Sequence, residues 1–132
     1  METLRTTEKI LREKGVRPSV VRLNVLDYLL KNRTHPPADE IYEALSGSIP
    51  TLSKTSVYNT LKLFVSKDMV LELEIDPKQK RYDGCTDFHG HFKCEKCGKI
   101  SDFEAKEPKD EVEGAFLKHK EIYYYGVCKS CV

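Results

Sequence analysis

The chain has 132 residues, of which 39% are hydrophobic and 33% charged, so it can form a core while keeping a well-solvated surface. This length suits one ordinary domain or two very small ones. No run approaches the roughly 18 to 20 apolar residues needed to cross a bilayer, and the first residues lack the apolar segment of a signal peptide. We therefore expect a globular, cytoplasmic protein with no membrane partner.

The charge is distributed unevenly along the chain, although its net value is only +1. Residues 1–67 carry 11 Lys/Arg against 7 Asp/Glu, whereas residues 84–132 carry 8 against 9. A basic N-terminal half is compatible with a nucleic-acid partner, but an ordinary solvated helical face gives the same count. Charge alone therefore leaves both interpretations open.

Three helices are predicted before residue 50, each from an apolar stripe. The stripes are Leu4, Thr7, Ile10 and Leu11; Leu23, Leu26 and Leu30; and Ala38, Ile41 and Leu45. The first helix should end at Gly15, because glycine is the usual residue past a helix C-terminus. The second should begin near Ser19, and the third should follow Pro36 and Pro37, which can precede a helix but not interrupt one.

A fourth helix, from about Ser53 to Lys67, is predicted to have two different faces. Val57, Leu61 and Phe64 fall on one side at steps of about 100° per residue. The opposite side is short of carboxylates and carries side chains that can reach base edges or phosphates, namely Thr55, Tyr58, Asn59, Lys62 and Ser66. This composition favours a DNA-reading helix.

A two-stranded hairpin is predicted directly after the fourth helix. Leu71, Leu73 and Ile75 alternate with glutamates, a turn follows at residues 76–78, and residues 80–83 form the return strand. Residues 1–83 therefore read as a winged helix-turn-helix domain. The alternative is a four-helix cap whose polar face only contacts water. Candidate phosphate contacts are Lys14, Arg17 and Arg22.

The cysteines indicate a zinc site. All five lie between residues 85 and 131, and four form two Cys-x-x-Cys pairs, Cys94 with Cys97 and Cys128 with Cys131. Two such pairs can enclose one tetrahedral, structural zinc ion. Disulfides are disfavoured without an export signal, and one redox motif does not explain a second copy. Cys85 is interpreted as a bystander.

The 30 residues between the two cysteine pairs could hold a strand, a helix and a strand. The strands are predicted over residues 100–104 and 121–127, and the helix over residues 108–118. Residues 84–132 would then form a small second domain.

A second metal site is suggested by histidine and aspartate residues. His89 and His91 alternate, so on a strand both imidazoles project from the same face. Asp83, Asp102 and His35 could complete a site for iron, manganese or zinc. Two histidines and a carboxylate also occur in non-haem iron oxygenases, but this chain has too few strands for their barrel. Metal storage would leave the helix-turn-helix face unexplained. We therefore expect no enzyme.

Several segments resemble the ferric uptake regulator family over nearly the whole chain. They are Thr-His-Pro-Pro-Ala-Asp-Glu-Ile-Tyr, Ser-Val-Tyr-Asn-Thr-Leu, Arg-Tyr-Asp, His-Gly-His-Phe-Lys-Cys-Glu-Lys-Cys-Gly-Lys-Ile and Tyr-Gly-Val-Cys-Lys-Ser-Cys. The resemblance implies an α+β protein with an N-terminal winged-helix domain, a hinge near Asp83 and a C-terminal α/β dimerisation domain. It further implies a homodimer that binds double-stranded, pseudo-palindromic operator DNA and has no small-molecule substrate.

Within the family, the regulatory residues resemble the peroxide-sensing branch. Iron-responsive members tend to have Glu at the positions of Asp83 and Asp102, and zinc-responsive members can have Cys at the position of Asp83. The resemblance implies structural Zn²⁺ and regulatory Fe²⁺ or Mn²⁺, with Zn²⁺ possible in vitro. It also implies that peroxide oxidises His35 or His89 to 2-oxo-histidine. The alternative is an iron- or zinc-responsive uptake regulator without peroxide sensing.

The ligand positions also predict how metal would control DNA binding. His35 belongs to the first domain, whereas His89, His91 and Asp102 belong to the second, so an ion bound by all of them would fix the angle between the domains. Metal would then select the arrangement in which both helices of a dimer reach their half-sites.

Overall fold

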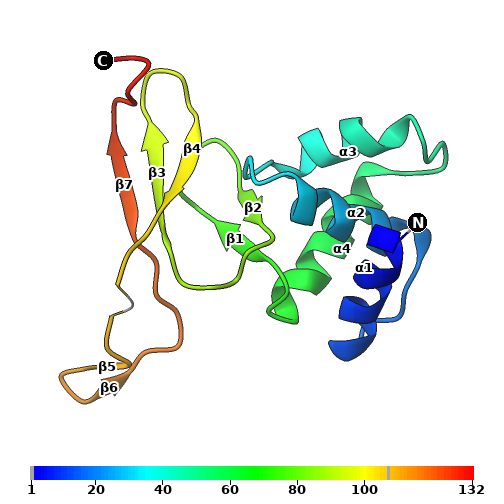
Figure 1. The fold of residues 1–132 in the computed structure, drawn as a ribbon, viewed down its shortest axis with the longest axis horizontal. Coiled ribbons are helices and arrows are strands. Elements are labelled where there is room, and N and C mark those ends of the chain that lie inside the picture. The colour runs from blue at the N-terminus through cyan, green and yellow to red at the C-terminus, as the bar shows by residue number, and fades with distance from the viewer. Residues whose placement is uncertain (1, 107) are drawn as a thin grey trace. The chain divides into compact units, whose positions relative to one another are not determined.

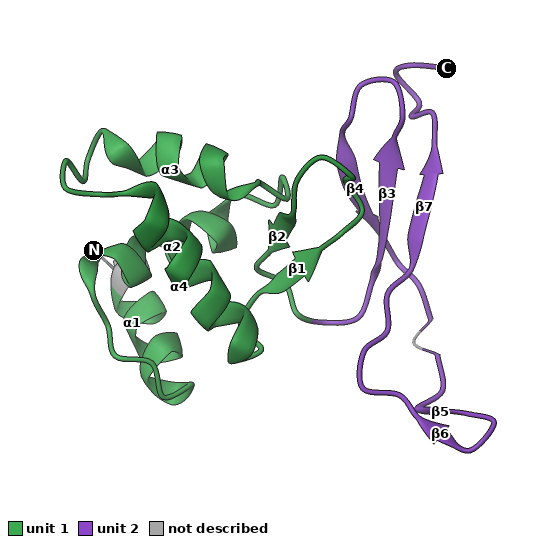
Figure 2. Cartoon of the chain, turned by 180° about the vertical axis from the view of Figure 1, so that it is seen from behind, with its two compact units in different colours: residues 1–86 green, residues 87–132 purple. Residues whose placement is uncertain are grey.

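The structure is a computed structural model that describes residues 2–106 and 108–132. The chain divides into two compact units, residues 1–86 and 87–132 (Figure 2). The sequence placed the domain boundary after Asp83, at the end of the predicted hairpin, whereas the units divide after Thr86. Among the helices of the described part of the chain, none combines the length and the apolarity needed to span a membrane.

The first unit contains four helices followed by a hairpin (Figure 1). The helices are α1 (Glu2–Glu13), α2 (Val20–Lys31), α3 (Ala38–Ser46) and α4 (Lys54–Ser66). Gly15 follows α1 with a φ of 73°, and the Ser19 side chain caps α2 by accepting the N–H of Arg22 at 3.2 Å. Ser53 and Ser56 form a capping box at the start of α4. These local signals explain why the predicted helices were confirmed.

The core of the first unit surrounds α2, which contacts α1, α3 and α4. Its buried residues are Val25, Leu26 and Leu29, which corrects the predicted stripe, because Leu30 is 39% exposed. Apolar residues lie on almost every side of α2, so spacing alone could not identify the buried face. In α1, Thr7 and Leu11 are buried, while the side chain of Leu4 lies outside the described part.

The hairpin consists of β1 (Leu71–Leu73) and β2 (Arg81–Asp83), which pair in antiparallel fashion with Leu71 opposite Asp83. Leu73 and Ile75 are buried, as the alternation predicted. The first unit therefore has the order of elements expected of a winged-helix domain, which is four helices followed by a β-hairpin.

The second unit is built on a three-stranded sheet in the order β4-β3-β7. Its strands are β3 (Gly90–Cys94), β4 (Ile100–Phe103) and β7 (Tyr123–Gly126). β3 runs antiparallel to β4 and parallel to β7. A Cβ atom at position 90 would overlap the ring of Phe103, so a larger residue than Gly90 would require that ring to move. In the register of these strands, Gly90 lies opposite Phe103 and His91 lies opposite Asp102.

The predicted helix over residues 108–118 is wrong. This segment forms a hairpin of β5 (Glu111–Val112) and β6 (Ala115–Phe116). Glu113 and Gly114 have φ values of 48° and 84°, and positive φ at both loop residues is the geometry of a two-residue type I′ turn. A glycine within a helix costs about 1 kcal/mol relative to alanine, and valine is a weaker helix former than alanine. These preferences favour the turn.

Candidate metal centres and DNA-binding face

Four cysteine sulfurs of the second unit lie together. Cys94 is the last residue of β3 and Cys97 follows that strand, while Cys128 and Cys131 follow the neighbouring parallel strand β7. Both pairs therefore lie at the same end of the sheet. All four sulfurs lie within 4.8 Å of one another, and none of the cysteines is in a disulfide. Each pair forms a tight turn, in which Gly98 N–H donates to Cys94 O and Cys131 N–H donates to Cys128 O, both at 2.9 Å.

The geometry and the electrostatics of this cluster fit a zinc ion. Tetrahedral zinc with Zn–S bonds of ~2.3 Å requires sulfurs about 3.8 Å apart, and Cys97 Sγ lies 3.8 Å from Cys128 Sγ. The backbone N–H groups of Cys97 and Cys128 donate to Cys94 Sγ at 3.4 Å and lower the pKa of Cys94 to about 6. Hydrogen bonds to Cys128 and then Cys97 raise the pKa of Cys131 to about 12. A divalent cation would stabilise all four thiolates.

A second set of donor atoms lies in the same unit, with His91 on β3, Asp102 on β4 and His89 directly before β3. Asp102 Oδ1 is 3.3 Å from His89 Nε2 and 3.5 Å from His91 Nε2. His89 Nδ1 lies 2.6 Å from the carbonyl oxygen of Asp87. Because a carbonyl oxygen only accepts, this contact places the proton on Nδ1 and leaves the Nε2 lone pair for a cation. This convergence on one carboxylate oxygen suits a divalent metal.

The first unit holds another pair of donors. His35 Nε2 lies 3.4 Å from Asp83 Oδ2, and both side chains are only 1% exposed. The other carboxylate oxygen of Asp83, Oδ1, accepts the backbone N–H of Cys85 at 2.9 Å and lies 3.4 Å from Arg33 Nε. These two contacts orient the carboxylate. One imidazole and one carboxylate could supply part of a metal site.

The outer face of α4 carries the predicted DNA-contacting residues. Thr55, Tyr58, Asn59, Lys62 and Ser66 are all exposed, whereas Val57, Leu61 and Phe64 are fully buried. Tyr58 is 49% exposed, and its hydroxyl lies 3.5 Å from Asp39 Oδ1 of α3. The two-sided pattern that the sequence predicted is therefore present.

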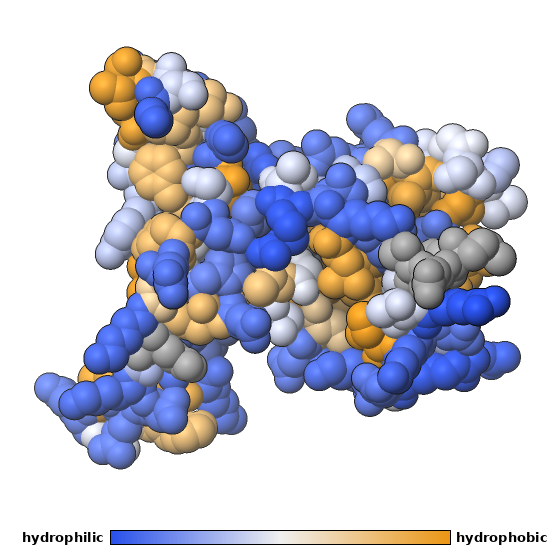
Figure 3. Space-filling model, viewed as in Figure 1, coloured by the Kyte–Doolittle hydropathy of each residue, from blue (hydrophilic) through white to orange (hydrophobic). Residues whose placement is uncertain are grey.

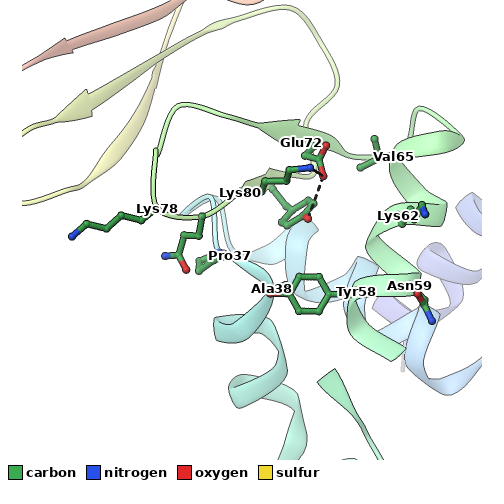
Figure 4. Close-up of a pocket in the computed structure, with 11 residues that line it drawn as sticks. Pro37, Ala38, Tyr58, Asn59, Lys62, Val65, Glu72, Lys78 and Lys80 are labelled. Carbon is green, nitrogen blue, oxygen red and sulfur yellow. Dashed lines mark hydrogen bonds and ion pairs between the residues drawn. The ribbon is translucent and has the colours of Figure 1, made fainter. Parts of the chain in front are cut away.

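A groove of about 630 Å³ separates α4 from the hairpin. Figure 4 shows Asn59 and Lys62 on the α4 side, with Lys78 and Lys80 contributed by the hairpin. Lys80 Nζ lies 3.5 Å from Glu72 Oε1, and the Tyr82 hydroxyl donates to the same oxygen at 3.4 Å. Burial and Glu72 raise the pKa of Tyr82 to about 12, so its hydroxyl keeps its proton.

Sequence reasoning did not select Lys78 and Lys80 as DNA-contact candidates. A signal was available, because both lysines lie in the loop of a hairpin that follows the predicted DNA-reading helix. Of the predicted phosphate contacts, Lys14 and Arg17 are exposed. Arg22 instead donates from Nη1 to the carbonyl oxygen of Arg17 at 2.9 Å, so it also orders the loop before α2.

The sequence profile of the Ferric uptake regulator family matches residues 13–125. The chain belongs to the ferric uptake regulator family. A relative in this family, the Peroxide operon regulator of Bacillus subtilis, is 38% identical over 134 residues, which cover 97% of this chain and 92% of the relative. The Peroxide-responsive repressor of Staphylococcus aureus is 40% identical over 128 residues, covering 92% and 86%.

Solved structures of the ferric uptake regulator family share the fold. The peroxide stress regulator of Campylobacter jejuni superposes with a TM-score of 0.72 at 28% identity, covering 99% of this chain and 100% of that one. The Ferric uptake regulator of Francisella tularensis with iron gives a TM-score of 0.73 at 26% identity, covering 89% and 95%. The predicted α+β class with an N-terminal winged helix is therefore confirmed.

Proposed function

We propose that this member of the ferric uptake regulator family is a metal-dependent transcriptional repressor. It binds pseudo-palindromic operator DNA in the cytoplasm and releases it when hydrogen peroxide is present. The observation that carries the proposal is the convergence of His89 Nε2 and His91 Nε2 on one oxygen of Asp102, at 3.3 and 3.5 Å. Its similarity to named peroxide regulators supports the choice of signal.

We assign the two sets of donors to one regulatory ion. His89, His91 and Asp102 supply three ligands and leave positions open, whereas His35 and Asp83 supply two. Iron(II) and manganese(II) accept mixed imidazole and carboxylate ligands, and five donors would nearly fill an octahedral shell. One ion that takes ligands from both units would favour one arrangement of those units, so DNA affinity would depend on metal.

The dimer interface is assigned to β7, an edge strand of the three-stranded sheet. β7 pairs with β3 on one side, and its Tyr124 and Tyr125 are 58% and 53% exposed. Figure 3 shows further apolar surface on the second unit. We propose that a second copy covers this edge. Two copies could then hold their α4 helices about 34 Å apart, the spacing of half-sites one helical turn apart.

DNA recognition is assigned to α4 and the groove beside it. Tyr58 and Asn59 would contact base edges, while Thr55 and Lys62 would contact bases or nearby phosphates. Lys14, Arg17 and Arg22 remain phosphate candidates. We add Lys78 and Lys80, because they border the groove beside the reading helix.

Replacement of Tyr58 tests the reading helix. Tyr58→Ala should weaken specific operator binding by about 10-fold, since a good base contact is worth ~1–3 kcal/mol, and it should leave metal content unchanged. Binding is measured by fluorescence anisotropy with operator and scrambled duplexes. Tyr58→Phe is the matched control that separates the ring from the hydroxyl. Equal operator affinity for Tyr58→Ala and wild type would exclude α4 as the reader.

Replacement of the hairpin lysines tests the groove. The double variant Lys78→Gln/Lys80→Gln should weaken binding to operator and scrambled DNA alike and lower the salt slope by about 2, because each lysine that neutralises a phosphate adds about one to that slope. The control Lys109→Gln/Lys118→Gln removes two cations from the other unit. An unchanged salt slope in the hairpin variant would contradict a phosphate role.

The peroxide step would act on a ligand imidazole. An iron(II) ion held by these residues would supply the redox chemistry that activates hydrogen peroxide. Overall, the peroxide would oxidise one imidazole by two electrons, placing one oxygen on a ring carbon and releasing water. We propose that His35 or His89 takes up this oxygen to give 2-oxo-histidine, so that the site loses a ligand and the operator is released. Peptide mass spectrometry after anaerobic iron loading should find one added oxygen atom at His35 or His89 and none in the manganese form. Oxidised cysteines with intact histidines would contradict the proposal.

A further inference from the structure

His35 has an unusual backbone conformation for a proposed metal ligand. Its φ is 56°, in the left-handed region that non-glycine residues seldom occupy. The side chain is 1% exposed. Such a conformation persists only where surrounding contacts hold it, so the structure must contain groups that fix this residue.

Two hydrogen bonds from β2 hold the backbone at His35 and Pro36. Arg81 Nη1 donates to the carbonyl oxygen of His35 at 3.1 Å, and the N–H of Tyr82 donates to the carbonyl oxygen of Pro36 at 3.1 Å. Both contacts join segments of the first unit that are far apart in the sequence. They fix the loop before α3 against the hairpin.

Arg81 is itself held in place by Asp76. Arg81 Nε donates to Asp76 Oδ2 at 3.1 Å, and the two side chains are only 18% and 7% exposed. The other oxygen of Asp76 accepts the backbone N–H of Lys78 at 2.9 Å. The carboxylate therefore orders the hairpin turn and the guanidinium together.

We propose that Arg81, held by Asp76, is a positioning residue that fixes His35 in its ligand conformation. This inference rests on the proposed function, because it concerns the regulatory ion to which His35 is assigned. Arg81 acts through the His35 carbonyl and supplies no ligand of its own. The guanidinium suits this role because its planar group presents Nε to Asp76 and Nη1 to the carbonyl oxygen at once. A lysine has all its donors on one nitrogen, so it cannot place separate nitrogens at the Nε and Nη1 positions.

The test measures manganese(II) binding to the zinc-containing protein without DNA, by electron paramagnetic resonance of free manganese. Arg81→Gln should bind manganese(II) about 10-fold more weakly, the usual effect of removing a partner that orients a ligand. Arg81→Lys should lie between Arg81→Gln and wild type. Arg12→Gln, which removes an exposed arginine paired with Glu8, is the matched control and should bind as wild type.

A double-mutant cycle separates positioning from general damage to the fold. If Arg81 acts through His35, Arg81→Gln should have no further effect on manganese(II) affinity in a His35→Ala background. Circular dichroism of the metal-free variants verifies folding, and Arg81→Lys replaces Arg81→Gln in the cycle if the latter unfolds.

The outcomes separate this inference from the proposed function. Wild-type manganese(II) affinity in Arg81→Gln, or an equal loss in both backgrounds, overturns the positioning role while the regulatory site stands. Unchanged affinity in His35→Ala alone overturns the ligand assignment, and the positioning role with it.

Discussion

Cys94→Ser is expected to leave the protein without structural zinc and with residues 87–132 unfolded. The Cys94 sulfur is the most enclosed of the four, since the residue has no exposed surface and accepts two backbone N–H groups. The second unit has little else to stabilise it. Its buried hydrophobic residues in the described part are Cys94 and Ile100, whereas the main apolar core lies entirely in the first unit. A bound structural zinc contributes folding free energy directly.

The measurement combines zinc content by mass spectrometry with limited proteolysis and sedimentation. We expect no retained zinc, cleavage between residues 87 and 132, a protected first unit and loss of the dimer. Cys85→Ser is the matched control, because Cys85 lies outside the cluster, and it should keep zinc and assembly. A stable, zinc-free dimer of Cys94→Ser would contradict the structural site.

Asp102→Asn should remove metal-activated DNA binding while leaving the structural zinc in place. Asp102 Oδ1 is the oxygen on which both imidazoles of the second unit converge. Asparagine keeps the shape but loses the negative charge that attracts a divalent cation. Because loss of an orienting partner alone costs about 10- to 100-fold, loss of this ligand should weaken manganese(II) binding roughly 100-fold or more.

Manganese(II) titrations of operator binding test this expectation. Asp110→Asn is the matched control, since it removes a carboxylate of the same unit that pairs with Lys120 at 2.6 Å. If Asp102→Asn is activated at the wild-type manganese(II) concentration, Asp102 is no ligand. If saturating manganese(II) restores full binding, the DNA-binding face is intact and the defect lies in the metal site.

The elements with strong local signals were predictable from the sequence. Ser53 and the spacing of Val57, Leu61 and Phe64 determine where α4 begins and which side it buries. The four clustered cysteines could likewise be selected from their spacing alone, because two Cys-x-x-Cys pairs are typical of one tetrahedral zinc site. Alternation placed His89 and His91 on one face.

Other features depend on choices that local sequence does not determine. α2 is apolar on most sides, so only its packing against three other helices decides that Leu29 is buried and Leu30 is exposed. Residues 108–118 form a turn at Glu113 and Gly114, although their sequence has a weak helical pattern. The bond from Arg81 to the His35 carbonyl joins residues distant in the sequence, and no periodicity indicates it.

The most direct test of the central claim is anaerobic operator binding by the zinc-only protein. The protein is titrated separately with iron(II), manganese(II) and additional zinc, and is then exposed to low hydrogen peroxide. We predict that iron(II) and manganese(II) both switch binding on, and that peroxide releases only the iron form. If the iron form stays bound after peroxide, the protein is a metal-uptake regulator and the peroxide-sensing assignment is wrong.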